Sequence, residues 1–525
     1  MAPFVCAVDV GTTSARAAIL DGKGRLLGRA DCPIAIRRAG PDIAEHDSED
    51  IWGAACHAVR AARAAARVRP DEIAGIAFDA TCSLVIRGRE GEALPLSASA
   101  GQDWDTIAWF DHRAQAEAAE CSATGHAVLD SIGGVMSPEM QLPKLMWLKR
   151  RRPDIWKKTG HLFDLADFLA WKATGTTGRS HCTLACKWTF GSGGEVGWNA
   201  AFLDIVGLSD LIARGGLPKQ TQPVGADLGS LTPEAAEALG LTTKCRVATG
   251  MIDAYAGTLG VLGGYAGNPA ELSGRAALVA GTSSCVMLLS PEPRRFAGAW
   301  GPYHGVALPG LWASEGGQSA TGALLDQTIR WHGAKPNAAT HGEIIARIAK
   351  LRGAEGEEFA ARLHVLPDFH GNRSPHADPR ALGVISGLAL DASFDGLCRL
   401  YWRTAVAIAF GVRQIVEAIR AAGHPAERLH LSGGHLRNQL LTELYRTAIG
   451  CTIVEPAGED AMLLGTGMAA AAAAGLHPGL AAAAVAMRQG EIEHRPDPAA
   501  FAGFDRDYRI FLEMQRQRQV LETIR

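Results

Sequence analysis

The chain has 525 residues, of which 47% are hydrophobic and 20% charged, and these values are typical of a soluble globular enzyme with two or three domains. The net charge of −3 creates no overall field that would attract nucleic acid or an anionic membrane, so we expect neither as a partner. The eleven cysteines include no CxxC spacing, and the sequence enters an apolar run without a basic leader. Both features predict a cytoplasmic protein.

Residues 4–20 predict a β-hairpin with a polar tip. A β-branched run carrying Asp9 near its end meets the turn Gly11, Thr12, Thr13, and a second apolar run follows at once. Backbone N–H groups and hydroxyls at such a tip suit phosphate oxygens, and a neighbouring carboxylate suits a divalent cation. An ordinary hairpin with a polar tip is the alternative.

The next elements are a helix and a buried strand. Helical periodicity runs from 51 to 68, and Ser48 is a candidate N-cap for this helix. The apolar run 73–78 ends at Asp79 and Thr81. Because ligands bind at strand ends in open α/β sheets, we expect these two residues in a ligand site, with a turn cap as the alternative.

Two later stretches combine polar and aromatic residues. An apolar run from 107 to 110 closes with Asp111 and Arg113, which suits a polyhydroxylated ligand or, alternatively, a local ion pair at the surface. Residues 180–188 contain Lys187 beside Trp188, a combination suited to sugar hydroxyls and sugar faces. A loop with a buried tryptophan explains the second stretch equally well.

Residues 247–257 predict a strand, a glycine turn and a helix that begins near Asp253. The helix dipole favours a carboxylate at this position. In a kinase, Asp253 would accept the proton of the acceptor hydroxyl. A capping aspartate is the alternative.

A second copy of the first hairpin pattern lies about half a chain away. Residues 277–289 read apolar run, Gly281-Thr282-Ser283-Ser284, apolar run, which indicates duplication of a whole lobe. The stretch 314–322 follows with a glycine pair beside Glu315, interpreted as a loop close to a ligand. Two phosphate hairpins from related lobes can face each other across a cleft.

The last third of the sequence predicts a strand, a glycine turn and a helix over 429–438, where Gly433 and Gly434 would let a flat adenine lie against the backbone. A strand follows at 451–456, then an alanine-rich helix, and an amphipathic helix over 507–525. The sequence contains no GxxxxGK[ST] motif, so a P-loop is not the phosphate-binding device.

These landmarks resemble the carbohydrate kinase branch of the sugar kinase, actin and Hsp70 superfamily, the FGGY family, along nearly the full length. The resemblance implies an α/β fold of two actin-like, ribonuclease H-like lobes with an ATP cleft between them. It places the first lobe at 1–265, the second at 275–490 and a helical extension at 491–525. A homodimer is left open.

The resemblance also implies roles for individual residues. DVGTTSARA looks like the first phosphate motif, GTSS the second and LSGGHLRN the adenosine motif, while Asp253 matches the family's catalytic base. FDATCS, CTLACKW and SEGGQSATG are similar to sugar-binding stretches of ribulokinases, and WFDHRA is similar to the D-ribulokinase group. The residues expected to bind the ketose are Asp79, Ala80, Thr81, Asp111, Lys187, Asp253 and Glu315. Those expected to bind ATP are Gly11, Thr12, Thr13, Arg16, Gly281, Thr282, Ser283, Gly433, Gly434 and Asn438, with Asp9 near Mg²⁺.

The expected reaction is therefore ATP- and Mg²⁺-dependent phosphorylation of the terminal hydroxyl of a ketopentose, D-ribulose before the others. The alternatives are L-ribulose, xylulose, a pentitol or glycerol as acceptor. Outside catalysis, the alternatives are a sugar sensor or a chaperone-like ATP-binding protein on the same fold.

Overall fold

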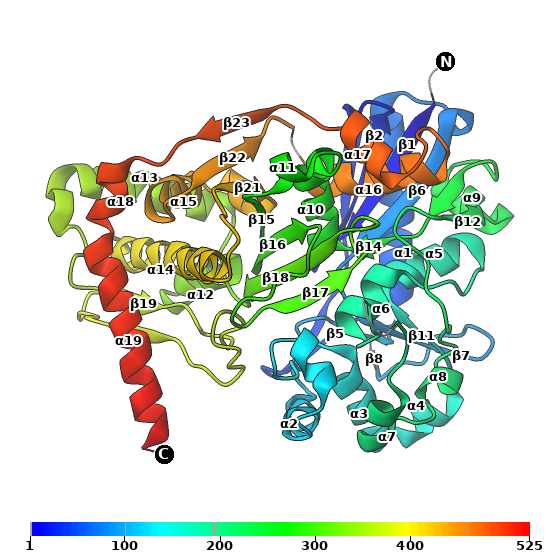
Figure 1. Cartoon of the computed structure of the whole chain (residues 1–525), viewed down its shortest axis with the longest axis horizontal. Helices are drawn as coiled ribbons and strands as arrows, with labels where there is room; N and C mark the ends of the chain where they lie inside the picture. Colours follow the sequence, from blue (N-terminus) through cyan, green and yellow to red (C-terminus); the bar gives the residue numbers. More distant parts are fainter. Residues whose placement is uncertain (1–2, 100, 193–195, 459, 525) are drawn as a thin grey trace.

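The computed structural model describes residues 3–99, 101–192, 196–458 and 460–524, and it forms two lobes, each built on a seven-stranded sheet (Figure 1). The first sheet has the order β12-β13-β6-β1-β2-β3, with β14 beside β6. Its strands are β1 (Phe4–Val10), β2 (Ser14–Asp21), β3 (Leu26–Pro33), β6 (Ile73–Ala80), β12 (Asp227–Ser230), β13 (Arg246–Ala248) and β14 (Met251–Ile252).

The second sheet has the order β17-β18-β16-β15-β21-β22-β23. Its strands are β15 (Arg275–Ala280), β16 (Ser284–Ser290), β17 (Trp300–His304), β18 (Trp312–Gln318), β21 (Arg428–Ser432), β22 (Thr452–Pro456) and β23 (Glu491–His494). In both sheets an antiparallel run of three strands continues into two parallel neighbours. The predicted duplication of a whole lobe and the two-lobed α/β fold class are confirmed.

Both predicted hairpins are present, with a four-residue tip at 11–14 and a three-residue tip at 281–283. Val10 pairs with Ala15 and Ala280 with Ser284, which leaves the two Gly-Thr turns outside the ladders. The Gly11 N–H donates to the Ser14 carbonyl at 3.0 Å, and the Gly281 N–H donates to the Ser283 carbonyl at 2.8 Å. The tips are therefore tight turns closed by their own backbone.

Two helices lie between the sheets and join the lobes. The first lobe supplies α10 (Asp253–Leu262), which packs on β15 and β21, and the second half of the chain supplies α16 (Ala461–Ala473), which packs on β1 and β6. Figure 1 shows α16, in orange, among the blue strands of the first lobe. At the helix crossing, a Cβ added to Gly260 would lie 1.9 Å from the Ala461 carbonyl oxygen, and one added to Gly465 would lie 2.0 Å from that of Ala256. Glycine is therefore required at both positions.

The first lobe also carries a second, five-stranded sheet of order β11-β7-β10-β5-β4, surrounded by short helices. Its strands are β4 (Arg37–Ala39), β5 (Ile43–His46), β7 (Leu84–Gly88), β10 (Thr106–Ile107) and β11 (Thr159–Asp164). The helices of this lobe are α1 (Ser48–Ala66), α2 (Gln115–Ala123), α3 (Gln141–Arg151), α4 (Pro153–Lys158), α5 (Leu165–Thr174), α6 (His181–Lys187), α7 (Ala200–Ile205), α8 (Leu211–Arg214) and α9 (Pro233–Leu239). The predicted strand at 107–110 is therefore much shorter than expected, and residues 181–187 form a helix where a loop was expected.

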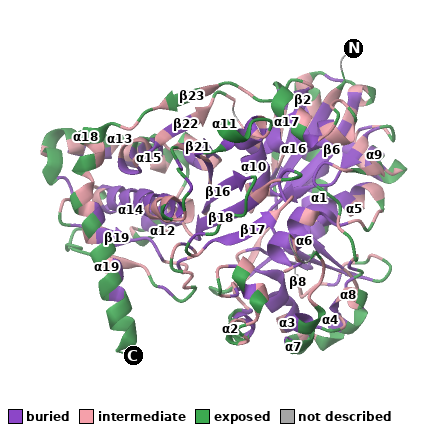
Figure 2. Cartoon of the chain, viewed as in Figure 1, coloured by how far each residue is buried: buried purple, intermediate pink, exposed green. Residues whose placement is uncertain are grey.

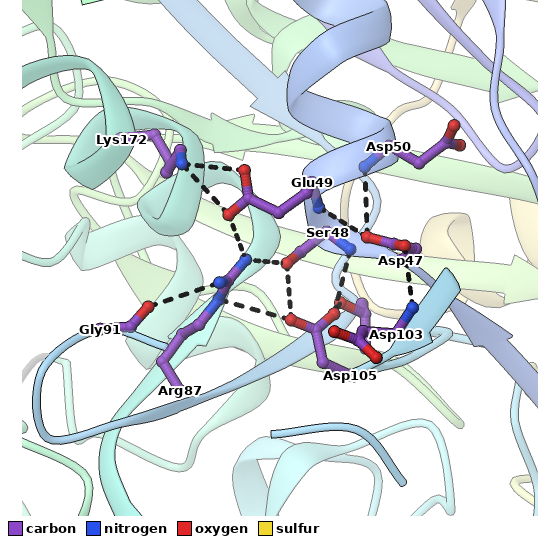
Figure 3. A network of polar contacts seen from close by, with 10 residues as sticks. Asp47, Ser48, Glu49, Asp50, Arg87, Gly91, Asp103, Asp105 and Lys172 are labelled. Atoms are coloured by element: carbon purple, nitrogen blue, oxygen red, sulfur yellow. Dashed lines mark hydrogen bonds and ion pairs between the residues drawn. The ribbon is translucent and has the colours of Figure 1, made fainter. Parts of the chain in front are cut away.

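The N-cap of α1 is Asp47 rather than the predicted Ser48 (Figure 3). Asp47 accepts hydrogen bonds from the N–H groups of Glu49 and Asp50. The Ser48 hydroxyl instead donates to Asp105 at 2.7 Å and contacts Arg87, which also pairs with Glu49 at 2.8 Å. The buried network of Ser48, Arg87 and Asp105 ties the start of α1 to β7, so a tertiary contact decides which of the two residues caps the helix.

In the second lobe, the helix α14 (Phe394–Ala421) is largely buried, whereas the last turns of α19 (Asp505–Thr523) are exposed (Figure 2). The other helices of this half are α11 (Pro269–Leu272), α12 (Gly322–Trp331), α13 (Ala338–Glu355), α15 (Gln439–Ala448), α17 (Leu480–Ala486) and α18 (Pro498–Gly503), and β19 (His364–Leu366) pairs with β20 (Val384–Ser386). The segment predicted as a helical extension, 491–525, begins with β23 at the edge of the second sheet. Arg525, the end of the predicted terminal helix, lies outside the described residues. No helix among the described residues is both long and apolar enough to cross a membrane.

Candidate active site

Two carboxylates lie side by side where the first hairpin meets β6. The strand registers place Asp9 opposite both Arg16 and Asp79. The Arg16 guanidinium pairs with Asp9 at 2.7 Å, and the Thr466 hydroxyl of α16 donates to Asp79. Both aspartates are fully buried. The sequence predicted Asp9, Arg16 and Asp79 as site residues, and the structure brings these three together.

The pKa values of both carboxyls are raised. Burial raises the pKa of Asp9 to about 7, against the lowering effect of Arg16, and the charges of Asp460 and Asp253 raise it further. Burial, followed by the charge of Asp9, raises the pKa of Asp79. This end of the cleft therefore holds an excess of negative charge, which a cation would relieve.

The carboxylate oxygens of this cluster fit a magnesium ion. One oxygen each of Asp9 and Asp79 is buried without a partner among the described residues, while the second oxygen of Asp9 pairs with Arg16. Among these residues, no three His, Cys, Asp or Glu side chains converge into a metal site of their own. Two carboxylates are enough for Mg²⁺, which is usually held by one or two carboxylates and completes its coordination shell with water and phosphate oxygens.

Asp79→Asn is expected to raise the thermal unfolding midpoint of the ligand-free protein more at pH 8 than at pH 5. An acid with a raised folded-state pKa stabilises the fold while protonated, and this stability is lost as the pH rises through about 7, the pKa of Asp9. The amide removes one charge from the pair, which corresponds to a gain on the order of 1–3 kcal/mol at pH 8. Scanning calorimetry at both pH values measures the difference, and a larger gain at pH 5 would contradict the assignment.

The first hairpin turn is only partly covered. Thr13 is exposed, and the Thr12 hydroxyl accepts a hydrogen bond from the Trp109 indole at 3.1 Å. Part of the turn is therefore accessible, and Arg16 follows it on β2, opposite Asp9.

Two neighbouring segments fix the second turn, residues 281–283, through hydrogen bonds. His435 Nε2 donates to the Gly281 carbonyl at 2.9 Å, and the Thr321 N–H donates to the Thr282 carbonyl at 3.0 Å. Thr282 itself is exposed and Ser283 is partly exposed. The turn is thus fixed in place while its hydroxyls remain accessible.

The predicted adenosine stretch lies directly beside this second turn. Gly433 has φ = 91°, and a Cβ there would lie 2.5 Å from the Ala280 carbonyl oxygen, whereas a Cβ on Gly434 would meet nothing closer than 3.7 Å. Gly433 is therefore required by the fold, and Gly434 leaves an open backbone surface. Asn438 is the N-cap of α15 and donates to the Tyr401 hydroxyl at 3.2 Å, so its side chain has a structural role.

Asp253 is the first residue of α10, as predicted. One carboxylate oxygen accepts a hydrogen bond from the Ala254 N–H at 2.7 Å. Burial raises the pKa of Asp253, while the Ala254 N–H and the charges of Lys187 and Arg16 oppose this rise. A carboxylate with a raised pKa is a better proton acceptor than an ordinary one.

Lys187 and Glu315 carry opposite charges that interact electrostatically across the lobes. Burial lowers the pKa of Lys187, but the charge of Glu315, together with Cys82 and Glu139, raises it above its usual value, and Lys187 in turn helps to hold the pKa of Glu315 below its usual value. Arg373 pairs with Glu315 directly. The ammonium of Lys187 and the guanidinium of Arg373 lie 4.1 and 3.9 Å from the ring centroid of Trp300. We call these four residues the charged interlobe cluster.

The other residues predicted to bind the ketose differ in whether their polar groups already have partners within the protein. Ala80 is buried on β6, and the Thr81 hydroxyl lies 3.2 Å from that of Ser83. Asp111 is buried rather than at the surface, and its carboxylate accepts hydrogen bonds from the Arg113 side chain, the Arg113 N–H and the Ala44 N–H. A sugar hydroxyl would have to displace one of these donors.

Sequence reasoning missed Arg373, Trp300 and His435 as parts of the site. Arg373 lies in a polar stretch, 371–375, outside the motifs that carry the family resemblance. Trp300 begins β17, and no local pattern marks it. His435 is inside the predicted adenosine stretch but supports the phosphate turn instead.

Comparison with known proteins agrees with this geometry. The model of the N-terminal domain of the FGGY family of carbohydrate kinases matches residues 4–260, and that of the C-terminal domain matches residues 276–474. The chain belongs to the FGGY family of carbohydrate kinases. It is accordingly a phosphotransferase, which decides against the non-enzymatic alternatives.

Relatives of this FGGY kinase span its whole length. A human FGGY carbohydrate kinase domain-containing protein is 39% identical over 539 residues, covering 99% of this chain and 97% of the relative. A D-ribulokinase of Saccharomyces cerevisiae is 36% identical over 521 residues, covering 90% and 72%. The crystal structure of a xylulose kinase from Rhodospirillum rubrum, 23% identical, matches with a TM-score of 0.75 over 99% of each chain. The cytoplasmic location and the homodimer stay predictions.

Proposed function

We propose that this FGGY kinase transfers the γ-phosphoryl group of ATP to the terminal hydroxyl of a ketopentose, D-ribulose, and forms D-ribulose 5-phosphate. One observation carries the proposal. Asp253 lies within electrostatic reach of Arg16 beside the first phosphate turn and of Lys187 and Glu315 in the charged interlobe cluster. The similarity to a D-ribulokinase over 90% of the chain supports the choice of acceptor.

In this proposal the two hairpin turns, 11–13 and 281–283, hold the phosphates, and Gly433 and Gly434 provide the surface for adenine. Asp9 and Asp79 would hold Mg²⁺, which when bound neutralises charge on the phosphate oxygens. Asp253 accepts the proton of the terminal hydroxyl while that oxygen bonds to the γ-phosphorus. The bond to the bridging oxygen breaks, and ADP leaves.

The remaining acceptor hydroxyls would contact the chain near Ala80, Thr81, Lys187 and Glu315. Opposite charges at Lys187 and Glu315 can donate to and accept from hydroxyls at the same time, which suits an uncharged polyol. Closure of the lobes excludes water, so that ATP is not hydrolysed without an acceptor.

An acceptor panel tests the proposal. D-ribulose, L-ribulose, D-xylulose, ribitol and glycerol are compared at equal concentration by the rate of ADP release. We expect the highest kcat/KM with D-ribulose. A higher value for another member of the panel would replace D-ribulose by that acceptor, and no acceptor-dependent ADP release would contradict the proposed function.

A further inference from the structure

A small pocket lies between the lobes beside the charged interlobe cluster. The first lobe contributes His112 and Glu139, and the second contributes Trp300, His370 and Arg373. The pocket has a volume of about 30 Å³. Since one water-sized group occupies roughly 10–15 Å³ on this measure, the pocket has room for about two hydroxyls.

Glu139 is the acidic group of this pocket. Its side chain is 3% exposed. Its backbone is fixed, because its N–H donates to the Ser137 hydroxyl at 3.2 Å and its carbonyl accepts from Lys144 at 3.4 Å. None of the hydrogen bonds and ion pairs found among the described residues involves its carboxylate. Its oxygens are not among the buried atoms that lack a partner, so the carboxylate is open to the pocket, where it can accept hydrogen bonds from the hydroxyls of a ligand.

Two further polar atoms of the pocket residues are also without partners. His112 Nε2 and Arg373 Nε are buried, and neither makes a hydrogen bond within the described part of the chain. The His112 ring stacks on that of His370 with centroids 4.0 Å apart. Burial lowers the pKa of His112 to about 4, so the ring is neutral at pH 7. Its free nitrogen can therefore donate a hydrogen bond to a hydroxyl or accept one from it.

The pocket is continuous with the residues proposed to bind the acceptor. Arg373 pairs with Glu315 on one side and lines the pocket on the other. The charge of Glu139 is among those that raise the pKa values of Lys187 and Arg373. In addition, α6, which ends at Lys187, packs against β17, which begins at Trp300.

We propose that Glu139 and His112 form a subsite for the hydroxyls at the end of the acceptor remote from the transferred phosphoryl group, and that Glu139 selects acceptors long enough to reach it. This inference rests on the proposed function. The ligand class is an uncharged polyol, because the pocket combines an acceptor carboxylate, a neutral imidazole and an aromatic wall.

Glu139→Gln tests the subsite through acceptor length. Glycerol reproduces carbons 3 to 5 of D-ribulose but lacks the remote end. We expect kcat/KM for D-ribulose to fall about 10- to 100-fold, the range for a hydrogen bond to a charged group. The value for glycerol and the rate of ATP hydrolysis without acceptor are expected to stay within about twofold of the unsubstituted protein.

The matched control is Glu117→Gln on α2, which replaces a carboxylate that is 4% exposed and does not line the pocket. It is expected to leave all three rates unchanged. His112→Gln provides a second variant, in case Glu139→Gln does not fold, and is expected to show a smaller loss confined to D-ribulose.

Equal losses for D-ribulose, glycerol and acceptor-free hydrolysis, or no loss at all, would overturn the subsite while leaving the kinase reaction intact. Failure of the unsubstituted protein to phosphorylate any acceptor would instead contradict the proposed function and the subsite together.

Discussion

Asp253→Asn is expected to lower kcat for D-ribulose phosphorylation by about 10²- to 10⁴-fold while the KM for ATP changes little. The amide preserves the size of the side chain and the oxygen that accepts from the Ala254 N–H, so α10 still begins at residue 253. It removes the basic oxygen that takes the hydroxyl proton. Steady-state ADP release, with ATP and then acceptor varied, measures both effects.

Asp105→Asn is the control for this variant. Asp105 is likewise a buried carboxylate with a raised pKa, about 6, but it belongs to the network around Ser48 and Arg87 (Figure 3). Its replacement is expected to affect stability and to leave kcat near the unsubstituted value. Near-normal turnover of Asp253→Asn would exclude Asp253 as the proton acceptor.

Gly465→Ala is expected to lower the free energy of unfolding by about 3–5 kcal/mol. The added methyl would lie 2.0 Å from the Ala256 carbonyl oxygen, and this atom belongs to the backbone of α10, so no side chain can move aside. The helices α10 and α16 must separate, which also displaces Asp253 at the start of α10. Urea denaturation and kcat are expected to change together.

Gly342→Ala is the matched control, because Gly342 also lies inside a helix, α13, and a Cβ there meets nothing within 4 Å. It is expected to stabilise the protein by about 0.5–1 kcal/mol, the ordinary gain of alanine over glycine in a helix. A Gly465→Ala protein within 1 kcal/mol of the unsubstituted chain would show that the helices can part without cost.

The parts of the fold that depend on local pattern could be predicted from the sequence. Both hairpins have apolar runs that flank a Gly-Thr turn, and such pairs need no distant partner to be recognised. The start of α10 at Asp253 is equally local. Family membership then extended these elements to a two-lobed kinase.

Other elements depend on contacts between distant residues, which the sequence does not display. The glycine pair in 314–322 suggested a loop, but the segment to Gln318 is the strand β18. Its glycines leave room for neighbouring side chains, because a Cβ on Gly316 would lie 2.9 Å from Phe296 and one on Gly317 would lie 2.8 Å from Arg373. The pairing of Glu315 with Arg373 follows from that packing.

The sequence also could not decide between neighbouring residues of similar chemistry. Asp47 and Ser48 are both good N-caps, and only the partnership of Ser48 with Asp105 leaves the cap to Asp47. The sequence also gives no sign that Lys187 lies near Glu315, because the two residues are far apart in the chain. A loop without a binding role therefore explained Lys187 equally well.

The position of α16 has a consequence for biosynthesis. The strands β1 and β6 leave the ribosome well before residues 461–473, which cover one of their faces. Until then the amino-terminal sheet exposes an apolar surface, so its nascent chain depends on delayed compaction or on chaperones. We therefore expect the two halves recognised by family models to unfold as one cooperative unit, and a gene fragment ending between them to yield an aggregating product.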